Sequence, residues 1–151
     1  MIKTILRNLL LLSVLFFLHP GCALIHSTPG GNNPPPPEVN ELVKTTQSWN
    51  GAILPAYPQG RPEITILRIR IPAGTRLDVH RHPVINAGVM TRGQLTVVTK
   101  DGKTLHLEAG DPIVEVVNTW HYGMNEGKAP AEIVVFYAGI VDTPITVLED
   151  R

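Results

Sequence analysis

The chain of 151 residues contains one cysteine, Cys22, and few aromatic residues, which make up 5% of it. A single cysteine excludes a disulfide bond within the chain, so packing must hold the fold, helped by any bound metal. The 13 basic residues balance the 13 acidic ones, but Lys3 and Arg7 lie in an N-terminal leader, and without them 11 basic residues face 13 acidic ones. A net charge near −2 gives no electrostatic signature of nucleic-acid binding, so we expect no nucleic-acid partner.

One long apolar run is present, from Leu9 to Leu18, and it follows the positive charges of Lys3 and Arg7. Because it is too short to cross a membrane as a helix, residues 1–21 predict a signal peptide. Cys22 comes next, where a bacterial lipoprotein carries its lipidated cysteine, although the preceding leucine lies one position further away than usual. Cleavage after Ala23 by ordinary signal peptidase is the alternative. We expect an exported protein of the bacterial periplasm or cell envelope, held to a membrane by a lipid on Cys22.

Residues 22–44 form a linker between this cysteine and the remaining chain. Four consecutive prolines occupy positions 34–37, and residues 27–40 contain almost nothing apolar to bury. A proline run favours extended polyproline backbone, so these fourteen residues could reach roughly 40 Å. The composition predicts a spacer between a lipid anchor and a domain of residues 45–151. A disordered N-terminus without any membrane role is the alternative.

The rest of the chain shows no convincing helical period, and several short segments alternate between apolar and polar residues. The segments that predict strands are 63–71, 94–100, 103–107, 113–117 and 133–137. Asp101-Gly102 lies between two of them and predicts a hairpin with a type I′ turn, in which both central residues have positive φ. Many short strands with glycine and proline turns predict an all-β sandwich or barrel.

Two glycine-punctuated segments concentrate the chemistry of the chain. They contain Gly74, His80, His82, Asn86 and Gly93 in the first, and Gly110, Asp111, His121 and Asn125 in the second. His80 and His82 share one face of a strand because they are two residues apart, so His121 must come from another strand. Three converging imidazoles bind one divalent transition metal and leave positions open for water, oxygen or substrate. Histidines on a half-buried strand that are merely solvated or hydrogen-bonded to the backbone are the structural alternative.

These two segments resemble the paired motifs of the cupin superfamily. The first family motif is Gly, five residues, His-x-His, three or four residues, Glu, six residues and Gly, and this chain departs from it only at Asn86, where Glu is usual. In the second motif, Val116-Val117-Asn118 replaces the usual Pro-x-Gly. The resemblance covers roughly residues 45–145 and implies a small antiparallel jelly-roll barrel, or double-stranded β-helix, with the metal inside. It does not imply one reaction, because cupins include dioxygenases, isomerases, lyases, decarboxylases and sugar-binding proteins.

Asn86 removes the negative charge that the usual glutamate gives to the metal. Neutral ligands leave the full charge of the ion, so the site should favour an anionic partner. Asn86 either ligates through its amide oxygen, holds a water, or points away and bonds a neighbouring strand. Glu115 is the candidate catalytic base if it shares an inward face with Ile113 and Val117. Periodicity leaves this open, because Val114 and Val116 would form an equally apolar inward face.

Cupins with three histidine ligands are often iron dioxygenases, so the resemblance implies a metal-dependent oxidoreductase that acts on a small anionic or enolisable compound. A non-catalytic module that binds or senses a small molecule, and a structural lipoprotein, are the alternatives. Fe, Mn, Zn, Cu and Ni all stay open as the metal, and so does a homodimer. Among the remaining residues, His106 should face solvent, Trp49 should fill the core, and Trp120 and Tyr122 could shape the mouth of the pocket.

Overall fold

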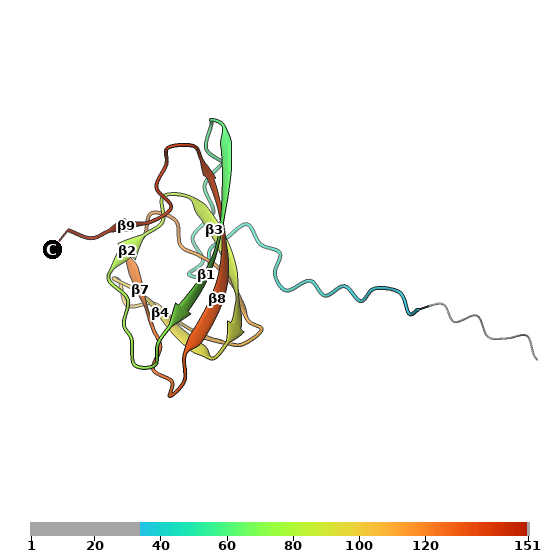
Figure 1. Cartoon of the computed structure of the whole chain (residues 1–151). Coiled ribbons are helices and arrows are strands. Elements are labelled where there is room, and N and C mark those ends of the chain that lie inside the picture. The colour runs from blue at the N-terminus through green and yellow to red at the C-terminus, as the bar shows by residue number, and fades with distance from the viewer. Residues whose placement is uncertain (1–33, 151) are drawn as a thin grey trace, which may run out of the picture. The chain divides into compact units, whose positions relative to one another are not determined.

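The computed structural model describes residues 34–150, so the predicted signal peptide and Cys22 lie outside the described range. Residues from Glu38 onward form one compact unit of two antiparallel sheets (Figure 1). One sheet has the strand order β1-β8-β3-β6 and the other the order β5-β4-β7-β2-β9. The strands are β1 (Pro62–Ile71), β2 (His80–Arg81), β3 (Ile85–Arg92), β4 (Gln94–Thr99), β5 (Thr104–Glu108), β6 (Pro112–Val114), β7 (His121–Met124), β8 (Ala131–Ile140) and β9 (Val147–Leu148).

The predicted all-β class is confirmed over the described residues. None of them forms a helix of the length and hydropathy needed to cross a membrane. All five predicted strand segments contain a strand, and the longest pair, β1 and β8, runs antiparallel with Pro62 opposite Ile140 and Ile71 opposite Ala131 (Figure 1). The exposure of β1 alternates along its length, as expected for a strand with one face on a core.

The hairpin between β4 and β5 forms as predicted, but its turn is not of type I′. Gly102 has a φ of 87°, whereas Asp101 is not among the residues with positive φ. The Asp101 carboxylate accepts a hydrogen bond from the Thr99 hydroxyl group, and the Gly102 amide donates to the Thr99 carbonyl at 2.9 Å. The side chain of Asp101 therefore stabilises a turn in which only the glycine adopts the left-handed conformation.

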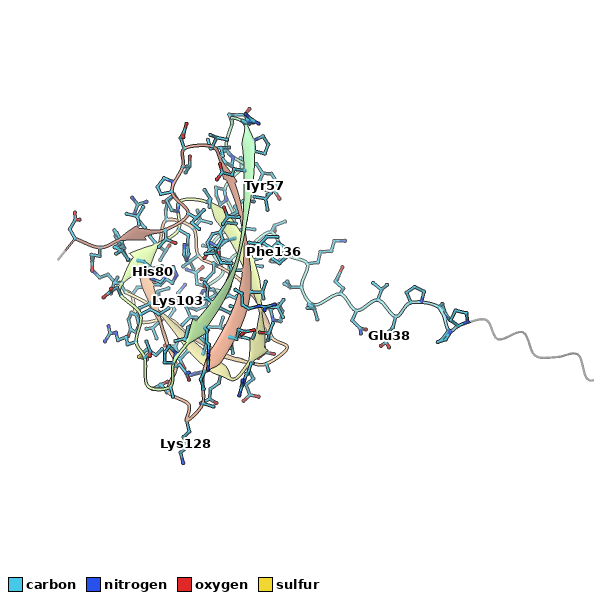
Figure 2. The ribbon with its side chains drawn as sticks, in the orientation of Figure 1. Glu38, Tyr57, His80, Lys103, Lys128 and Phe136 are labelled. Atoms are coloured by element: carbon cyan, nitrogen blue, oxygen red, sulfur yellow. The ribbon has the colours of Figure 1, made fainter. Side chains whose placement is uncertain are left out.

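The hydrophobic core lies between the two sheets. Side chains from both sheets fill this space (Figure 2). The buried apolar residues include Ile71, Met90, Val97, Leu107, Ile113, Ile133 and Val135. The outward face of the four-stranded sheet is also partly apolar, because Ile64, Ile66 and Phe136 are more than half exposed. Ile66 and Phe136 are register partners on β1 and β8, so they form one exposed patch.

Asn118 explains how the chain folds without the Pro-x-Gly of the second cupin motif. It occupies the position of the motif glycine and has a φ of 52°, in the left-handed region. Asparagine is one of the few residues other than glycine that adopt this conformation at low cost. Its side-chain oxygen also accepts a hydrogen bond from Arg81 at 2.6 Å, and its amide donates to the His82 carbonyl at 2.8 Å. The turn that precedes His121 is thus kept although the motif is lost.

Gly88 is the tightest backbone approach in the four-stranded sheet, and we expect Gly88→Ala to destabilise the fold. A Cβ atom there would lie 2.8 Å from the Val134 carbonyl oxygen and 3.1 Å from Val135 Cγ2. Overpacking of this kind costs about 1–3 kcal/mol. Gly139→Ala is the matched control, because its Cβ would meet nothing closer than 3.5 Å. Urea denaturation should show a loss for the first variant alone, and equal midpoints for the two would contradict the packing argument.

Candidate metal centre

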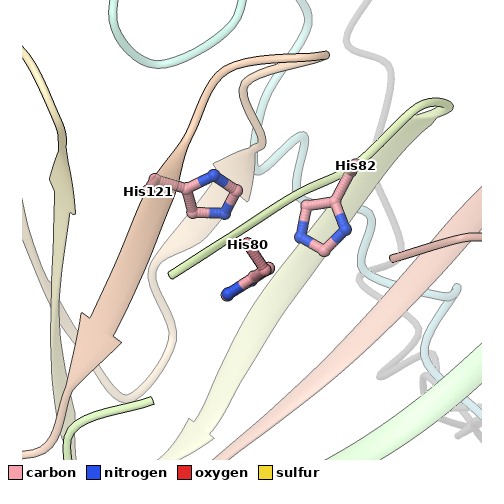
Figure 3. A group of neighbouring side chains, drawn as sticks. All are labelled: His80, His82 and His121. Atoms are coloured by element: carbon pink, nitrogen blue, oxygen red, sulfur yellow. The ribbon is translucent and has the colours of Figure 1, made fainter. Parts of the chain in front are cut away.

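The three predicted histidines converge between the sheets (Figure 3). His80 on β2 is the direct register partner of His121 on β7, and His82 follows the end of β2. One ring nitrogen of each lies within 4.8 Å of those of the other two. Ligand nitrogens that share one tetrahedral ion lie about 3.4 Å apart, so small side-chain rotations complete such a site. His82 and His121 are buried, with 5% and 1% of their surfaces exposed.

Each of the three imidazoles is held by a backbone carbonyl group. The Nδ1 atoms of His80, His82 and His121 lie 2.8 Å from the carbonyl oxygens of Asp78, Ile145 and Thr119 respectively. A carbonyl oxygen can only accept, so each Nδ1 atom carries the proton and donates it. The lone pair of every ring is therefore on Nε2. Hydrogen bonds of this kind orient the ligating histidines of metal sites.

Unpartnered buried acceptors test whether a metal fits these residues. Among the described residues, the buried side-chain atoms without a hydrogen-bond partner are Trp49 Nε1, Asn86 Oδ1, Glu115 Oε2 and His121 Nε2. Three of the four are acceptors, and all three belong to residues that line one cavity. A buried acceptor left without a partner costs about 1–3 kcal/mol. A cation among them removes this cost, so the donor set fits a single divalent transition metal.

Burial keeps the histidines neutral, which is the form that binds metal. It lowers the pKa of His82 to about 4, against the opposing effect of the hydrogen bond to Ile145. Burial also lowers the pKa values of His80 and His121 below the ordinary value of 6.5. A neutral imidazole can bind a metal ion at physiological pH without first losing a proton.

Asn86 and Glu115 both line the same cavity. The sequence alone did not decide the direction of either side chain. The Asn86 amide nitrogen donates to the Val84 carbonyl at 3.4 Å, and its oxygen has no partner. Glu115 Oε2 lies 3.7 Å from His121 Nε2. Burial raises the pKa of the Glu115 carboxyl to about 7, while a hydrogen bond from the Val116 backbone opposes the rise. Both residues therefore line the cavity, and Glu115 faces inward.

The cavity has a volume of about 290 Å³ and mostly aliphatic walls. Its apolar lining includes Leu67, Ile69, Leu77, Val97, Ile133 and Leu148. Its charged lining residues are the acidic Asp78 and Glu115, and no lysine or arginine is among them. An anion that enters must therefore find its countercharge on the metal, while an apolar body fits the walls.

Tyr137 is a cavity residue that the sequence analysis missed as part of the site. It is the β8 register partner of Asn86, and its ring lies edge-on to that of His82, with centroids 5.5 Å apart. Burial and the nearby charge of Glu115 raise the pKa of its phenol to about 12, so it stays a hydrogen-bond donor. Its place within a short β-branched run marks it as core, and only strand register reveals it at the site.

Three residues predicted near the centre serve other purposes. Asn125, 1% exposed, donates from its amide nitrogen to the carbonyl oxygens of Ile71, Pro72 and Ala129, so it holds a loop and does not line the cavity. Trp120 and Tyr122 do not line the cavity either. The guanidinium group of Arg81 lies 5.4 Å from the Trp120 ring and that of Arg76 lies 3.8 Å from the Tyr122 ring, as cation–π pairs.

Two other expectations are confirmed. Trp49 packs against the hydrophobic core, as predicted for a large aromatic in a small domain. His106 is exposed on β5, where its Nδ1 atom lies 3.0 Å from the Thr96 hydroxyl group.

Comparison with known proteins agrees with this architecture. Residues 67–137 match the family model described as a cupin domain. An uncharacterised protein with a double-stranded β-helix domain from Klebsiella pneumoniae superposes with a TM-score of 0.50 at 20% identity, covering 62% of this chain and 89% of that one. A structure of DMSP lyases gives 0.51 at 15% identity, covering 58% and 44%. An oxalate oxidase in complex with the substrate analogue glycolate gives 0.49 at 24% identity, covering 56% and 45%.

These likenesses are likenesses of fold. The chain covers less than half the length of the oxalate oxidase and lyase chains. No curated protein sequence matches it significantly. The matched domain, the two antiparallel sheets and the three inward-facing histidines nevertheless agree with one another. Residues 67–137 thus match the cupin domain in sequence, and the described residues have the two-sheet fold of the double-stranded β-helix structure.

Proposed function

We propose that the protein is an exported, metal-dependent oxidoreductase of the dioxygenase type that acts on a small anionic or enolisable compound. The observation that carries this proposal is the set of three neutral imidazoles whose Nε2 atoms face an apolar cavity, next to a buried carboxyl group. Three neutral protein ligands leave room at the ion for a substrate and a second small molecule.

Each residue of the site has a proposed role. His80, His82 and His121 hold the metal through Nε2, and Asn86 faces it with its amide oxygen. When bound, the ion supplies Lewis acidity toward an oxygen atom of the substrate and, if it is redox-active, electron transfer. Glu115 accepts the proton that leaves the substrate on enolisation, since its pKa of about 7 suits proton transfer near neutral pH.

Tyr137 completes the polar end of the cavity. Its phenol stays protonated, so it can donate a hydrogen bond to a substrate oxygen. The aliphatic walls exclude water from the remaining space and hold the substrate's apolar part. In the proposed reaction, one substrate molecule and one molecule of oxygen give products that contain both oxygen atoms. No further reductant is required.

The volume and charge of the cavity limit which compounds can be the substrate. Its volume of about 290 Å³ equals the space of about ten water molecules in the liquid, which limits the substrate to a small molecule. Because its charged lining residues are both acidic, the ion would be the one positive group that an anionic substrate meets among the lining residues. We therefore propose a compound with one enolisable or acidic group and an apolar body.

Oxygen uptake tests the proposed reaction. We expect protein loaded with Fe²⁺ to consume oxygen in the presence of one class of small β-dicarbonyl or phenolic compounds. His121→Ala, treated identically, should show no uptake above that of free iron. Binding of these compounds to the loaded protein without any uptake would overturn the enzymatic proposal and favour a binding or sensing module.

The metal ligands can be tested without a substrate. We expect His80→Ala to reduce metal content from one ion per chain to less than about a tenth, because binding free energy is coupled to a folded ligand set. A metal at about 100 times its Kd adds about 2.7 kcal/mol to stability, or roughly 10 °C in Tm for a domain of this size. Elemental analysis and thermal unfolding with and without metal measure both quantities.

His106→Ala is the matched control, because His106 is exposed on β5 and does not line the cavity. It should keep full metal content and the full metal-dependent gain in Tm. Equal metal content in the His80→Ala and wild-type proteins would remove His80 from the ligand set.

We also propose that Cys22 anchors the protein in a bacterial membrane. Its position after the apolar run and before the proline spacer motivates this. Cys22→Ser should abolish lipidation and move the protein from the membrane fraction to the soluble fraction, since acyl chains supply the membrane affinity. Mass spectrometry of the wild-type N-terminus should find acyl chains on Cys22. A mature N-terminus after Ala23 would contradict the anchor.

A further inference from the structure

We infer that Glu115 supplies the carboxylate ligand of the metal site, in place of the glutamate that cupins usually have at the position of Asn86. This inference rests on the three-histidine metal site of the proposed function and gives Glu115 the role of ligand in addition to that of base. It gives the chain a three-histidine, one-carboxylate set in which the carboxylate comes from the residue that follows β6.

Strand register makes the two positions equivalent. On β3 and β6, Ala87 is paired with Val114 in antiparallel register, and the Glu115 amide donates to the Asn86 carbonyl at 3.0 Å. The pairing therefore continues by one residue beyond β6 and places Asn86 directly opposite Glu115. Directly opposed residues have Cβ atoms about 4.5–5.5 Å apart on the same face of the sheet. A carboxylate on either residue thus reaches the same part of the cavity.

The distance between Glu115 and His121 fits a shared cation. Glu115 Oε2 lies 3.7 Å from His121 Nε2, and both atoms are buried without a hydrogen-bond partner. This separation is too long for a hydrogen bond. Because His121 Nδ1 donates to the Thr119 carbonyl, the facing Nε2 atom is an acceptor like the carboxylate oxygen. Two ligand atoms at about 2.1 Å from one ion are separated by about 3.0 Å at a 90° angle and about 3.6 Å at 120°.

The backbone of Glu115 is fixed for this purpose by a segment that precedes the first strand. The Ser48 hydroxyl group donates to the Glu115 carbonyl at 2.8 Å, and the Trp49 amide donates to the Val114 carbonyl at 2.9 Å. Together with the bond to Asn86, these contacts hold both sides of the chain just beyond β6. Such fixation limits the entropy that Glu115 loses on ligation.

Titration with Co²⁺ alone tests the assignment, because the absorption of Co²⁺ reports its coordination as well as its affinity. Glu115→Gln keeps the size of the side chain and should lower Co²⁺ affinity at least tenfold and change the visible spectrum. Glu63→Gln is the matched control, since Glu63 is exposed on β1 and does not line the cavity, and the Co²⁺ affinity of this variant should change less than threefold.

The double variant Asn86→Glu/Glu115→Asn, in which the two residues are exchanged, gives the sharper test. It moves the carboxylate back across the strand pair, so it should recover Co²⁺ affinity to within about threefold of wild type, whereas Glu115→Asn alone stays weak. Recovery also shows that the single variant lost a ligand and not its fold. An exchanged protein no tighter than Glu115→Asn would overturn the equivalence of the two positions.

Wild-type Co²⁺ affinity and spectrum in Glu115→Gln would overturn the inference outright. If His121→Ala has lost Co²⁺ in the same experiment, that result leaves the three-histidine site of the proposed function intact. If His121→Ala also binds Co²⁺ as wild type does, the proposed metal site itself fails.

Discussion

The centre of this protein depends on three hydrogen bonds between imidazole Nδ1 atoms and backbone carbonyl groups. The carbonyls of Asp78, Thr119 and Ile145 fix the tautomer of each histidine, so every free lone pair is on the nitrogen that faces the cavity. Burial of the rings lowers their pKa values, although the hydrogen bonds to the carbonyl groups oppose this shift. These bonds thus give three buried imidazoles a common orientation toward the cavity, which a shared metal ion requires.

Register across the four-stranded sheet supplies the other half of the site. Asn86 on β3 has Tyr137 on one side and Glu115 on the other, which puts an amide, a phenol and a carboxyl group in one row on the inner face. The loss of the motif glutamate is therefore a local exchange within this row. It leaves one carboxyl group in this row, as in the cupin motif, and this is the basis on which we assign the ligand role to Glu115.

The spacing of the histidines was sufficient to predict that they converge, because side-chain alternation on a strand is a local property. The direction of Glu115 was not predictable. Ile113 and Val116 are both fully buried, since regular pairing ends near Glu115 and alternation ends with it. Tyr137 was missed for a related reason, since only pairing with a strand fifty residues earlier brings it to Asn86. The left-handed φ of Asn118 shows that a motif can change its residues and keep its backbone.

The carbonyl of Ile145 has a consequence for the order in which the centre is assembled. A chain made from its N-terminus contains both histidine motifs twenty residues before the carbonyl that orients His82. Until that last segment docks against β2 through β9, His82 lacks its carbonyl partner, whereas the partners of His80 and His121 lie within or beside the histidine motifs. The three imidazoles therefore have all their carbonyl partners only when the C-terminal segment is docked.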